Sequence, residues 1–303
     1  MTIVKTCGKL YWAGEYAILE PGQLALIKAI PIYMTAEIKA SNDYRLYSDM
    51  FSYSVDLRPD SSYALIQETV ALVEEYLTAQ GVELQPFSLD VRGKMEREGK
   101  KFGLGSSGSV VVLVIKAMLA FYERLADREL LFKLASAVLL KRGDNGSMGD
   151  IACIVSEDLV LYQSFDREKV AQWLEKEDLQ AVLARDWGFS IRSVEPVLTF
   201  DFLVGWTKEV AVSSHMVKQI KDNMNPSFLQ ASKETVANLV KALEVGQEET
   251  IIDLLEQASQ LLEGLSSDIY TPSLRQLKDA SRDLKAVAKS SGAGGGDCGI
   301  ALS

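Results

Sequence analysis

The chain is poor in histidine and cysteine, and this scarcity excludes several kinds of chemistry. Its 303 residues include one histidine, His215, and three scattered cysteines. A hydrolase triad would have to pair His215 with Ser213 or Ser214, which lie too close to it in sequence for the usual geometry. A zinc site would lack its histidine and cysteine partners, and three scattered cysteines form no disulfide framework. Any metal is therefore expected to be held by oxygen atoms, which favours Mg²⁺.

Long apolar segments and a surplus of positive charge are also missing. No apolar run in the sequence reaches the ~18 to 20 residues that span a bilayer, and the N-terminus lacks the pattern of a signal peptide. We therefore expect a cytoplasmic protein without a membrane partner. The net charge of −10 argues against nucleic acid as a partner, because phosphate backbones are bound by basic surfaces. An anionic small substrate must then be held by a few local cations.

The length and the apolar patterns predict an α+β protein of two domains. At 303 residues and 48% hydrophobic composition, the chain can form two cores. We place the boundary near Pro196, which divides the chain into domains at 1–195 and 196–303. The predicted strands lie at 3–7, 24–30, 32–38, 44–47, 51–55, 87–91, 151–155, 159–162 and 198–206. The predicted helices lie at 62–79, 107–124, 127–141, 214–222, 226–245, 248–262 and 272–288.

The most informative segment is the small-residue loop Gly103-Leu-Gly-Ser-Ser-Gly-Ser109, which opens directly into an apolar run. Glycines and serines in succession let backbone N–H groups turn toward one centre, and a helix that follows adds its unpaired N-terminal amides and its dipole. Lys100 and Lys101, just before the loop, add positive charge. The segment therefore predicts a phosphate-binding loop.

Two common phosphate loops do not fit this segment. A Walker A motif requires lysine where the chain has Ser109. The three glycines also match a dinucleotide fingerprint, but the preceding residues are strongly polar and the nearest acid in the expected place, Glu123, falls in the same predicted helix. An ordinary glycine-rich turn that caps a core helix remains the alternative at this point.

A second glycine loop, residues 290–297, lies far from the first in sequence and runs into the apolar segment 298–302. Ala293 is the only residue between Gly292 and Gly296 that is not glycine. Such a loop can wrap phosphate from a second side with its backbone amides. The alternative is a flexible linker, although linkers rarely lead straight into a strand-like segment.

Three segments in this order resemble the three motifs of the GHMP kinases, the family of galactokinase, homoserine kinase and mevalonate kinase. They are Gly8-Lys-Leu-Tyr-Trp-Ala-Gly-Glu-Tyr16, the loop at 103–109 and the loop at 291–297. Segments 142–150 and 204–214 are further similar to the members that act on mevalonate 5-phosphate. The similarity covers essentially the whole chain. It implies an N-terminal domain like ribosomal protein S5, a ferredoxin-like C-terminal domain, and transfer of the γ-phosphoryl group of ATP to mevalonate 5-phosphate.

The same resemblance implies roles for individual residues. MgATP would lie over the first glycine loop, with Ser107 approaching Mg²⁺. The implied catalytic residues are Lys9, Lys101 and Asp150. The implied ATP-binding residues are Lys101, Gly103, Leu104, Gly105, Ser106, Ser107, Gly108 and Ser109. The implied acceptor-binding residues are Lys9, Tyr16, Ser147, Ser213, Gly292, Ala293 and Gly294.

The chemistry of the acceptor narrows these roles. A phosphate with a second pKa of about 6 is already mostly ionised near neutrality, so the reaction needs positioning and charge neutralisation more than proton removal. We hypothesise that Lys9 and Lys101 bring the two anions together, while Asp150 orients Lys9 or the metal rather than acting mainly as a base. The alternatives are that the lysines are solvated surface charges, that Asp150 ends a turn, and that Ser213 caps a helix.

Other functions on the same fold stay open. A GHMP kinase of another branch would phosphorylate an uncharged alcohol, and a noncatalytic sensor would bind ATP without forming ADP. The sequence does not determine the oligomeric state. Because the chain stops at Ser303, directly after a strand-like segment, we expect an incomplete C-terminal domain whose last strand lacks a neighbour.

Overall fold

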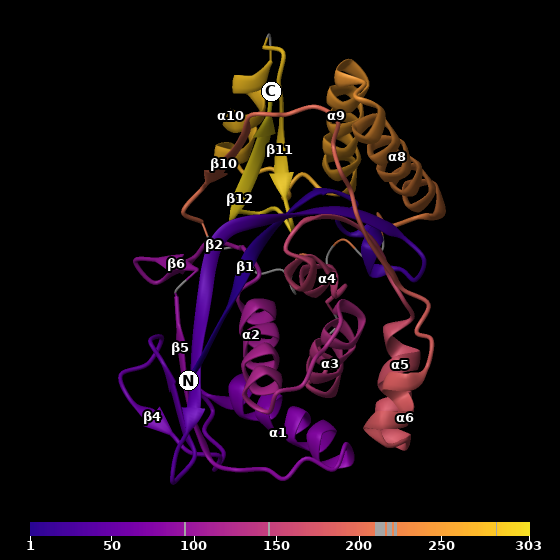
Figure 1. Cartoon of the computed structure of the whole chain (residues 1–303). Coiled ribbons are helices and arrows are strands. Elements are labelled where there is room, and N and C mark those ends of the chain that lie inside the picture. Colours follow the sequence, from indigo (N-terminus) through magenta and orange to yellow (C-terminus); the bar gives the residue numbers. More distant parts are fainter. Residues whose placement is uncertain (94, 145, 210–215, 217–219, 221–222, 283) are drawn as a thin grey trace.

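Two β-sheets organise the molecule, a larger one in the first two thirds of the chain and a smaller one in the last third (Figure 1). The computed structural model describes residues 1–93, 95–144, 146–209, 216, 220, 223–282 and 284–303. The described strands of the larger sheet are, in spatial order, β4 (Ser54–Val55), β3 (Arg45–Ser48), β5 (Phe87–Arg92), β2 (Leu24–Ala40), β8 (Leu159–Gln163) and β9 (Ser190–Ser193), with β1 (Thr2–Ala13) paired to β2.

The long strand β2 is the centre of this sheet. It pairs antiparallel with β1 along its length, and with β5 and β8 at its two ends. The predicted strands at 24–30 and 32–38 are thus one strand that runs through Pro31. Proline donates no ladder hydrogen bond, and the register with β1 shifts where Cys7 faces Tyr33 but Gly8 faces Ile30. This bulge places Pro31 outside the regular pairing.

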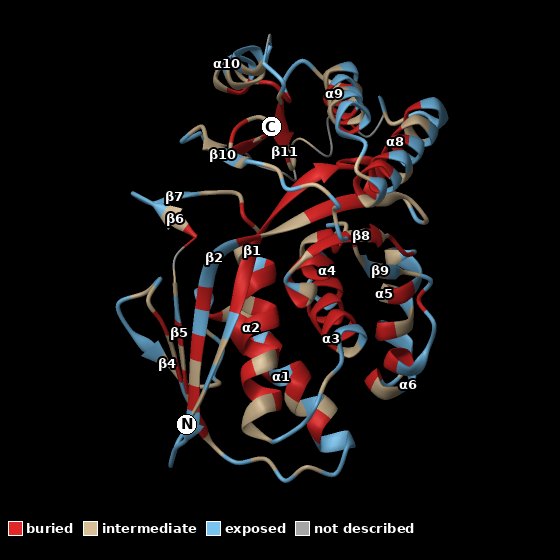
Figure 2. Ribbon diagram, turned by 45° about the horizontal axis from the view of Figure 1, so that its top comes forward, coloured by how far each residue is buried: buried red, intermediate tan, exposed pale blue. Residues whose placement is uncertain are grey.

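Helices α2 and α4 pack against the strands of the larger sheet, and α2, α3 and α4 are mostly buried. Figure 2 shows α2, α3 and α4 mainly in the colour of buried residues. Their apolar residues face every direction, which is typical of helices enclosed by a core. The helices of this part of the chain are α1 (Ala64–Ala79), α2 (Ser106–Phe121), α3 (Arg128–Lys141), α4 (Gly149–Ser156), α5 (Arg167–Lys176) and α6 (Leu179–Ala184), with the 3-10 turn η1 (Ala17–Leu19).

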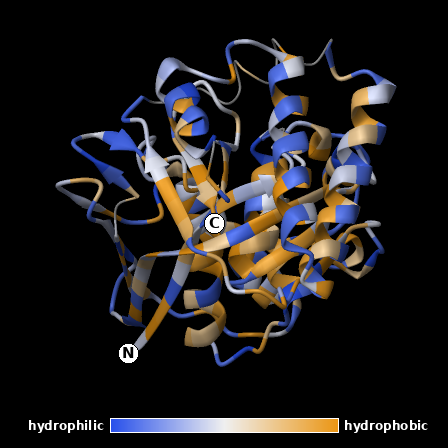
Figure 3. Ribbon diagram, turned by 90° about the horizontal axis from the view of Figure 1, so that it is seen from above, coloured by the Kyte–Doolittle hydropathy of each residue, from blue (hydrophilic) through white to orange (hydrophobic). Residues whose placement is uncertain are grey.

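The smaller sheet has the described order β10-β12-β11, all antiparallel. Figure 3 shows that the helices of this part of the molecule carry both hydrophobic and hydrophilic residues, and α8 and α9 bury only some of their residues, which is typical of amphipathic helices. Trp12 of the larger sheet stacks on Phe202 of the smaller one, with ring centroids 5.7 Å apart. The elements are β10 (Phe202–Trp206), α8 (Pro226–Val245), α9 (Glu248–Leu265), α10 (Pro272–Ser281), β11 (Val287–Ser291) and β12 (Cys298–Leu302).

Most predicted helices are confirmed, and three other predictions are wrong. Residues 151–155, predicted as a strand, form α4; all five are buried, and a short run that is apolar on every side has no diagnostic period. The helix predicted at 272–288 ends at Ser281, and its last residues begin β11. The last strand, β12, does not lack a neighbour, because it lies between β10 and β11.

Some elements were missed or fall outside the description. The short hairpin of β6 (Glu96–Arg97) and β7 (Lys100–Lys101) precedes the first glycine loop and was not predicted, nor were α5, α6 and β9. Two-residue strands are too short for a periodic pattern. The helix predicted at 214–222 lies outside the described residues except for 216 and 220. Among the described helices, none combines the length and apolarity needed to cross a membrane.

Candidate active site

A pocket of about 470 Å³ lies where the first glycine loop, the end of β1 and the second glycine loop meet. Its walls come from segments that are up to about 290 residues apart in sequence. The lining residues are Lys9, Tyr11, Glu15, Tyr16, Ile18, Leu19, Lys101, Gly103, Gly105, Ser106, Ser107, Asp144, Gly146, Ser147, Asp150, Gly292, Ala293 and Asp297.

The first glycine loop forms one wall and leads into the N-terminus of α2. Gly105 precedes the helix in the left-handed conformation, with φ 81° and ψ 38°, which glycine adopts without steric cost. The amides of the first turn have no partners inside the helix, and they carry the positive end of its dipole. Ser106 and Ser107 line the pocket at this point. The wall is therefore a ready site for phosphate oxygens.

Lys9 projects from β1 onto this loop. Its side chain is mostly buried, and its Nζ donates to the carbonyl of Gly103 at 3.3 Å. Its Nζ also lies 5.4 Å from the centroid of the Tyr11 ring. A Cβ atom on Gly105 would lie 2.9 Å from the Lys9 Cε. The glycine is thus needed both for its backbone angle and for the close approach of the lysine.

Asp150 approaches the same loop from the first turn of α4. A Cβ atom on Gly108 would lie 2.8 Å from its Oδ2. Burial raises the pKa of the Asp150 carboxyl above its ordinary value, while the positive charge of Lys9 opposes that rise. The carboxylate accepts a hydrogen bond from the Ile151 amide at 2.9 Å. A cation, a carboxylate and a helix N-terminus therefore converge on one side of the pocket.

Ser147 is held in the pocket wall by two buried tyrosines. Its hydroxyl shares a 3.0 Å hydrogen bond with the Tyr11 hydroxyl. Its carbonyl accepts from the Tyr162 hydroxyl at 2.9 Å. Burial raises the pKa of both tyrosines, so both hydroxyls remain protonated near neutrality. These bonds fix the position of the serine hydroxyl before any ligand binds.

Tyr16 connects the first motif with the second glycine loop. Its hydroxyl donates to the carbonyl of Ala293, 277 residues away. Its backbone has φ 62° and ψ −54°, a strained conformation for a bulky residue, and such strain is often found at functional sites. Gly294 packs so tightly that a Cβ atom would lie 2.6 Å from the Ile269 carbonyl oxygen. The second loop is therefore anchored on both sides.

Family models match both parts of the chain. The model described as the GHMP kinases N terminal domain matches residues 64–157, and the model described as GHMP kinases C terminal matches residues 239–303. The chain belongs to the GHMP kinase family. It is therefore an enzyme of the kinase class, with the two-domain fold of mixed α and β structure that defines this family.

The similarity to known bacterial proteins extends along essentially the whole of this GHMP kinase chain. A structure of the Streptococcus pneumoniae phosphomevalonate kinase in complex with phosphomevalonate and AMPPNP is 74% identical, with a TM-score of 0.98, and the match covers 100% of this chain and 92% of that one. Another structure of the Streptococcus pneumoniae enzyme is 72% identical and has a TM-score of 0.93. The match covers 100% of this chain and 91% of that one. The phosphomevalonate kinase of Streptomyces sp. (strain CL190) is 30% identical, with 99% of this chain and 90% of that protein covered.

The structure of this GHMP kinase brings most of the predicted site residues together. Those that line the pocket are Lys9, Tyr16, Lys101, Gly103, Gly105, Ser106, Ser107, Ser147, Asp150, Gly292 and Ala293. Leu104, Gly108, Ser109 and Gly294 are not part of the pocket lining. The Ser109 hydroxyl is fully buried and donates to the Cys7 carbonyl at 2.7 Å, so it ties α2 to β1. Ser213 lies outside the described residues.

Sequence reasoning missed several pocket residues of the GHMP kinase, chiefly Glu15, Asp144 and Asp297. Glu15 stands beside Tyr16 in the first motif, and Asp297 ends the second glycine loop. The positions of Glu15 and Asp297 within these two motifs could have indicated a place in the pocket. They were passed over because a carboxylate is an unexpected neighbour for anionic ligands. A Cβ atom on Gly103 would lie 2.5 Å from the Asp297 Oδ2, so the two glycine loops touch at this point.

Proposed function

We propose that this GHMP kinase is a phosphomevalonate kinase, which converts mevalonate 5-phosphate and ATP to mevalonate 5-diphosphate and ADP. The observation that carries the proposal is the 74% identity, along the whole chain, with an enzyme whose structure contains phosphomevalonate and AMPPNP. The pocket supports it, because two glycine loops and the cations Lys9 and Lys101 enclose about 470 Å³ on a protein of net charge −10.

ATP is proposed to place its phosphates at the N-terminus of α2. Exposed Ser107 stands at the first turn of this helix, and exposed Lys101 precedes the loop. Mg²⁺ commonly binds proteins through one or two ligands and otherwise through substrate phosphates and water. Among the described residues no group of three or more His, Cys, Asp or Glu side chains is arranged to hold a metal ion. The Ser107 hydroxyl and the Asp150 carboxylate, which lie beside the N-terminus of α2, fit such a phosphate-bound Mg²⁺.

The acceptor is proposed to lie between Lys9, Ser147, Tyr16 and Ala293, with Ser213 as a further predicted contact. An oxygen of its phosphate forms a bond to the γ-phosphorus, and the bond from that phosphorus to the β–γ bridging oxygen breaks, leaving ADP. The attacking oxygen is already ionised near neutrality, so no proton has to be removed. Catalysis then consists of alignment and charge neutralisation, which Lys9 and Lys101 supply.

Asp150 is proposed to orient Lys9 or the metal. Its carboxyl faces the loop beside Lys9, where a negative charge steadies the ammonium group. A role as general base is the alternative, and it would matter for an alcohol acceptor. The two roles differ in their pH dependence, since a base must lose its proton within the working range of the enzyme.

The lysine roles are tested by Lys9→Met and Lys101→Met. Each change should lower kcat by about 10²-fold or more, because each removes a charge that stabilises the transferring phosphoryl group. Steady-state kinetics with a coupled ADP assay measures the loss, and circular dichroism checks the fold. Lys5→Met is the matched control, since Lys5 lies on the same strand outside the pocket and should keep normal turnover. Near-normal turnover in both pocket variants would contradict the assignment.

The reaction itself is tested by ADP formation with MgATP and a panel of mevalonate 5-phosphate, mevalonate, galactose and homoserine. Turnover with mevalonate 5-phosphate alone, with the diphosphate identified by mass, is the expected result. Turnover of an alcohol would move the protein to another branch of the family. ATP binding without turnover of any acceptor would indicate a sensor.

Two further proposals concern the domain boundary and the location of the protein in the cell. We propose domains at 1–195 and 196–303, which assigns β9, the last strand of the larger sheet, and β10, the first of the smaller sheet, to different domains. We also propose a cytoplasmic location, where ATP is abundant and where the three buried free cysteines would stay reduced.

A further inference from the structure

A buried ion pair lies behind the wall of the pocket. The Nζ of Lys289 in β11 is 2.5 Å from the Oε1 of Glu15, and both side chains are almost fully buried, at 1% and 3% exposure. The same Nζ donates to the Ser290 carbonyl at 2.6 Å. The two partners are 274 residues apart in sequence, one in the first motif and one just before the second glycine loop.

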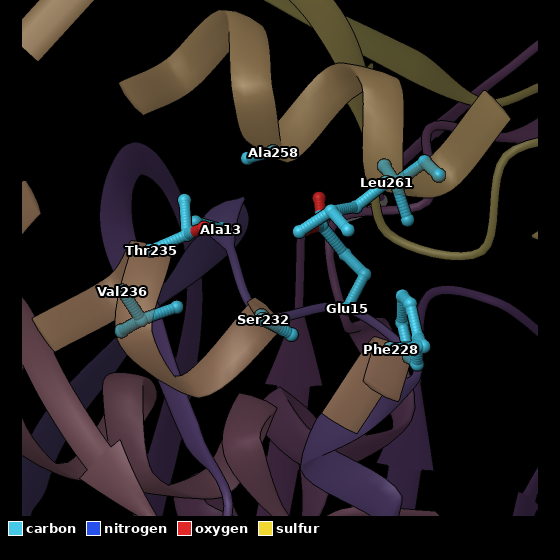
Figure 4. A pocket seen from close by; sticks show the side chains of 10 residues that line it. Ala13, Glu15, Phe228, Ser232, Thr235, Val236, Ala258 and Leu261 are labelled. Carbon is cyan, nitrogen blue, oxygen red and sulfur yellow. The ribbon is translucent and has the colours of Figure 1, made fainter. Parts of the chain in front are cut away.

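Solvent has little access to this pair. Figure 4 shows the side chain of Glu15 extending from its loop toward α9, among side chains of α8 and α9 such as Phe228 and Leu261. The cavity beside it has a volume of about 10 Å³, room for roughly one water molecule. A single water molecule compensates a buried charge only weakly, so the balance of the two charges is set mainly by the pair itself.

The pair is one of several contacts between the first motif and the second glycine loop. Glu15 lines the pocket beside Tyr16, whose hydroxyl bonds to Ala293. The Ser291 hydroxyl donates to the Tyr11 carbonyl at 2.9 Å, which is a second contact between β11 and the first motif. Three connections thus join the first motif to β11 and the loop that follows it. One of them is ionic.

Stability alone is a weak reason for such a pair. Desolvation of two charges offsets most of their attraction, and well-packed apolar residues are often as stable. Without its partner, Glu15 would leave an uncompensated negative charge in the wall of a pocket that must take an anionic acceptor. Close like charges disfavour binding because their repulsion is weakly screened in a buried site.

We propose that Lys289 is a positioning residue for the anionic acceptor: it neutralises Glu15 and tethers the loop of Ala293 to the first motif. This inference rests on the proposed function, because the acceptor is taken to be mevalonate 5-phosphate. Lys289 is not part of the pocket lining. It acts through Glu15 and through the backbone that leads to Gly292.

The two members of the pair should respond in opposite directions. Lys289→Met leaves Glu15 unneutralised, so the KM for mevalonate 5-phosphate should rise at least ~10-fold while the KM for ATP changes less than ~3-fold. Glu15→Gln leaves an excess positive charge and a side chain that still accepts from Lys289, so the same KM should stay level or fall. A purely structural pair would show similar losses in both variants, and that result would overturn the proposal.

A matched control is available in Lys133. It is also buried, forms an ion pair with Glu129 at 2.7 Å, and donates to the carbonyls of Leu183 and Arg185. It lies outside the pocket lining. Lys133→Met should lower stability but leave both KM values within ~2-fold of wild type. An equal rise in acceptor KM in this control would overturn the proposal.

If Lys289→Met does not fold, the double variant Glu15→Gln/Lys289→Met tests the same point, because it buries no unpaired charge. Its acceptor KM should lie within ~3-fold of wild type, because the hydrogen bonds of Tyr16 to Ala293 and of Ser291 to Tyr11 still hold the loop near the first motif. A ~10-fold rise would show that charge balance is not the cause. Failure of the wild-type enzyme to use mevalonate 5-phosphate would refute the proposed function instead.

Amide hydrogen exchange supplies a readout that needs no acceptor. Loss of the tether should speed exchange in residues 290–297 at least ~10-fold in Lys289→Met, or in the double variant, relative to Lys133→Met. Exchange in that loop unchanged from wild type would refute the tether whatever the substrate is.

Discussion

Replacing Gly105 by alanine would test whether the first glycine loop positions Lys9. Gly105 has φ 81°, and a Cβ atom there would lie 2.9 Å from the Lys9 Cε and 3.2 Å from its Cγ. The substitution therefore has two effects. The left-handed backbone angle lowers the stability of the protein, and the displacement of Lys9 lowers the rate of the reaction.

The two effects have different sizes and different readouts. A left-handed alanine costs about 1–2 kcal/mol in stability. Carbon atoms in contact lie about 3.5–4.0 Å apart, so Lys9 must withdraw by at least roughly 0.6 Å from its 2.9 Å position. A misplacement of about 1 Å can cost 10²-fold in rate, so kcat should fall about 10- to 100-fold.

Gly188→Ala separates these effects. Gly188 has φ 79°, but no described atom outside its chain neighbours lies within 4 Å of a Cβ placed there. Both variants should lose a few degrees of melting temperature, at about 2–4 °C per kcal/mol for domains of 150–250 residues. Steady-state kinetics should show a fall in kcat for Gly105→Ala alone. Equal turnover in the two variants would refute the view that the loop positions Lys9.

Three further predictions concern buried groups. Because burial raises the pKa of Asp150 in the folded state, the wild-type protein loses stability relative to Asp150→Asn as pH rises from 3.8 through the raised value. Urea unfolding should therefore find Asp150→Asn the more stable protein at pH 7 and no more stable below pH 4; equal stability at pH 7 would contradict this. Ser109→Ala should cost about 1 kcal/mol, through its lost bond to the Cys7 carbonyl, and leave the KM for ATP unchanged; a large rise would instead support ATP binding by Ser109. Burial raises the pKa of the Cys7 thiol to about 11, that of Cys298 to about 12, and that of Cys153 well above its ordinary value. A thiol reagent at neutral pH should therefore label all three much faster in denaturant than in the native protein, and rapid native labelling would refute this.

Local patterns predicted the elements that have a clear period or clear end signals. Helix α8 begins with the cap Asn225 and with Pro226, and ends before Gly246, which adopts the left-handed conformation. The prediction failed at α4, because this helix is enclosed on every side and its apolar residues therefore show no helical periodicity in the sequence. It failed again at β11, whose buried Lys289 and Ser290 are polar residues that read as the end of a helix. Both errors arise because burial, not local preference, decided the conformation.

The sequence by itself predicted a phosphate-binding loop and placed this protein with the GHMP kinases. That information is local, because a glycine loop followed by a helix start specifies backbone amides and a dipole through neighbouring residues alone. The tertiary structure alone decided how Lys9 meets Gly103, 94 residues away, and how Glu15 meets Lys289, 274 residues away. Contacts at such separations depend on how the two sheets pack and on the exclusion of water between them. No short segment encodes either of these conditions.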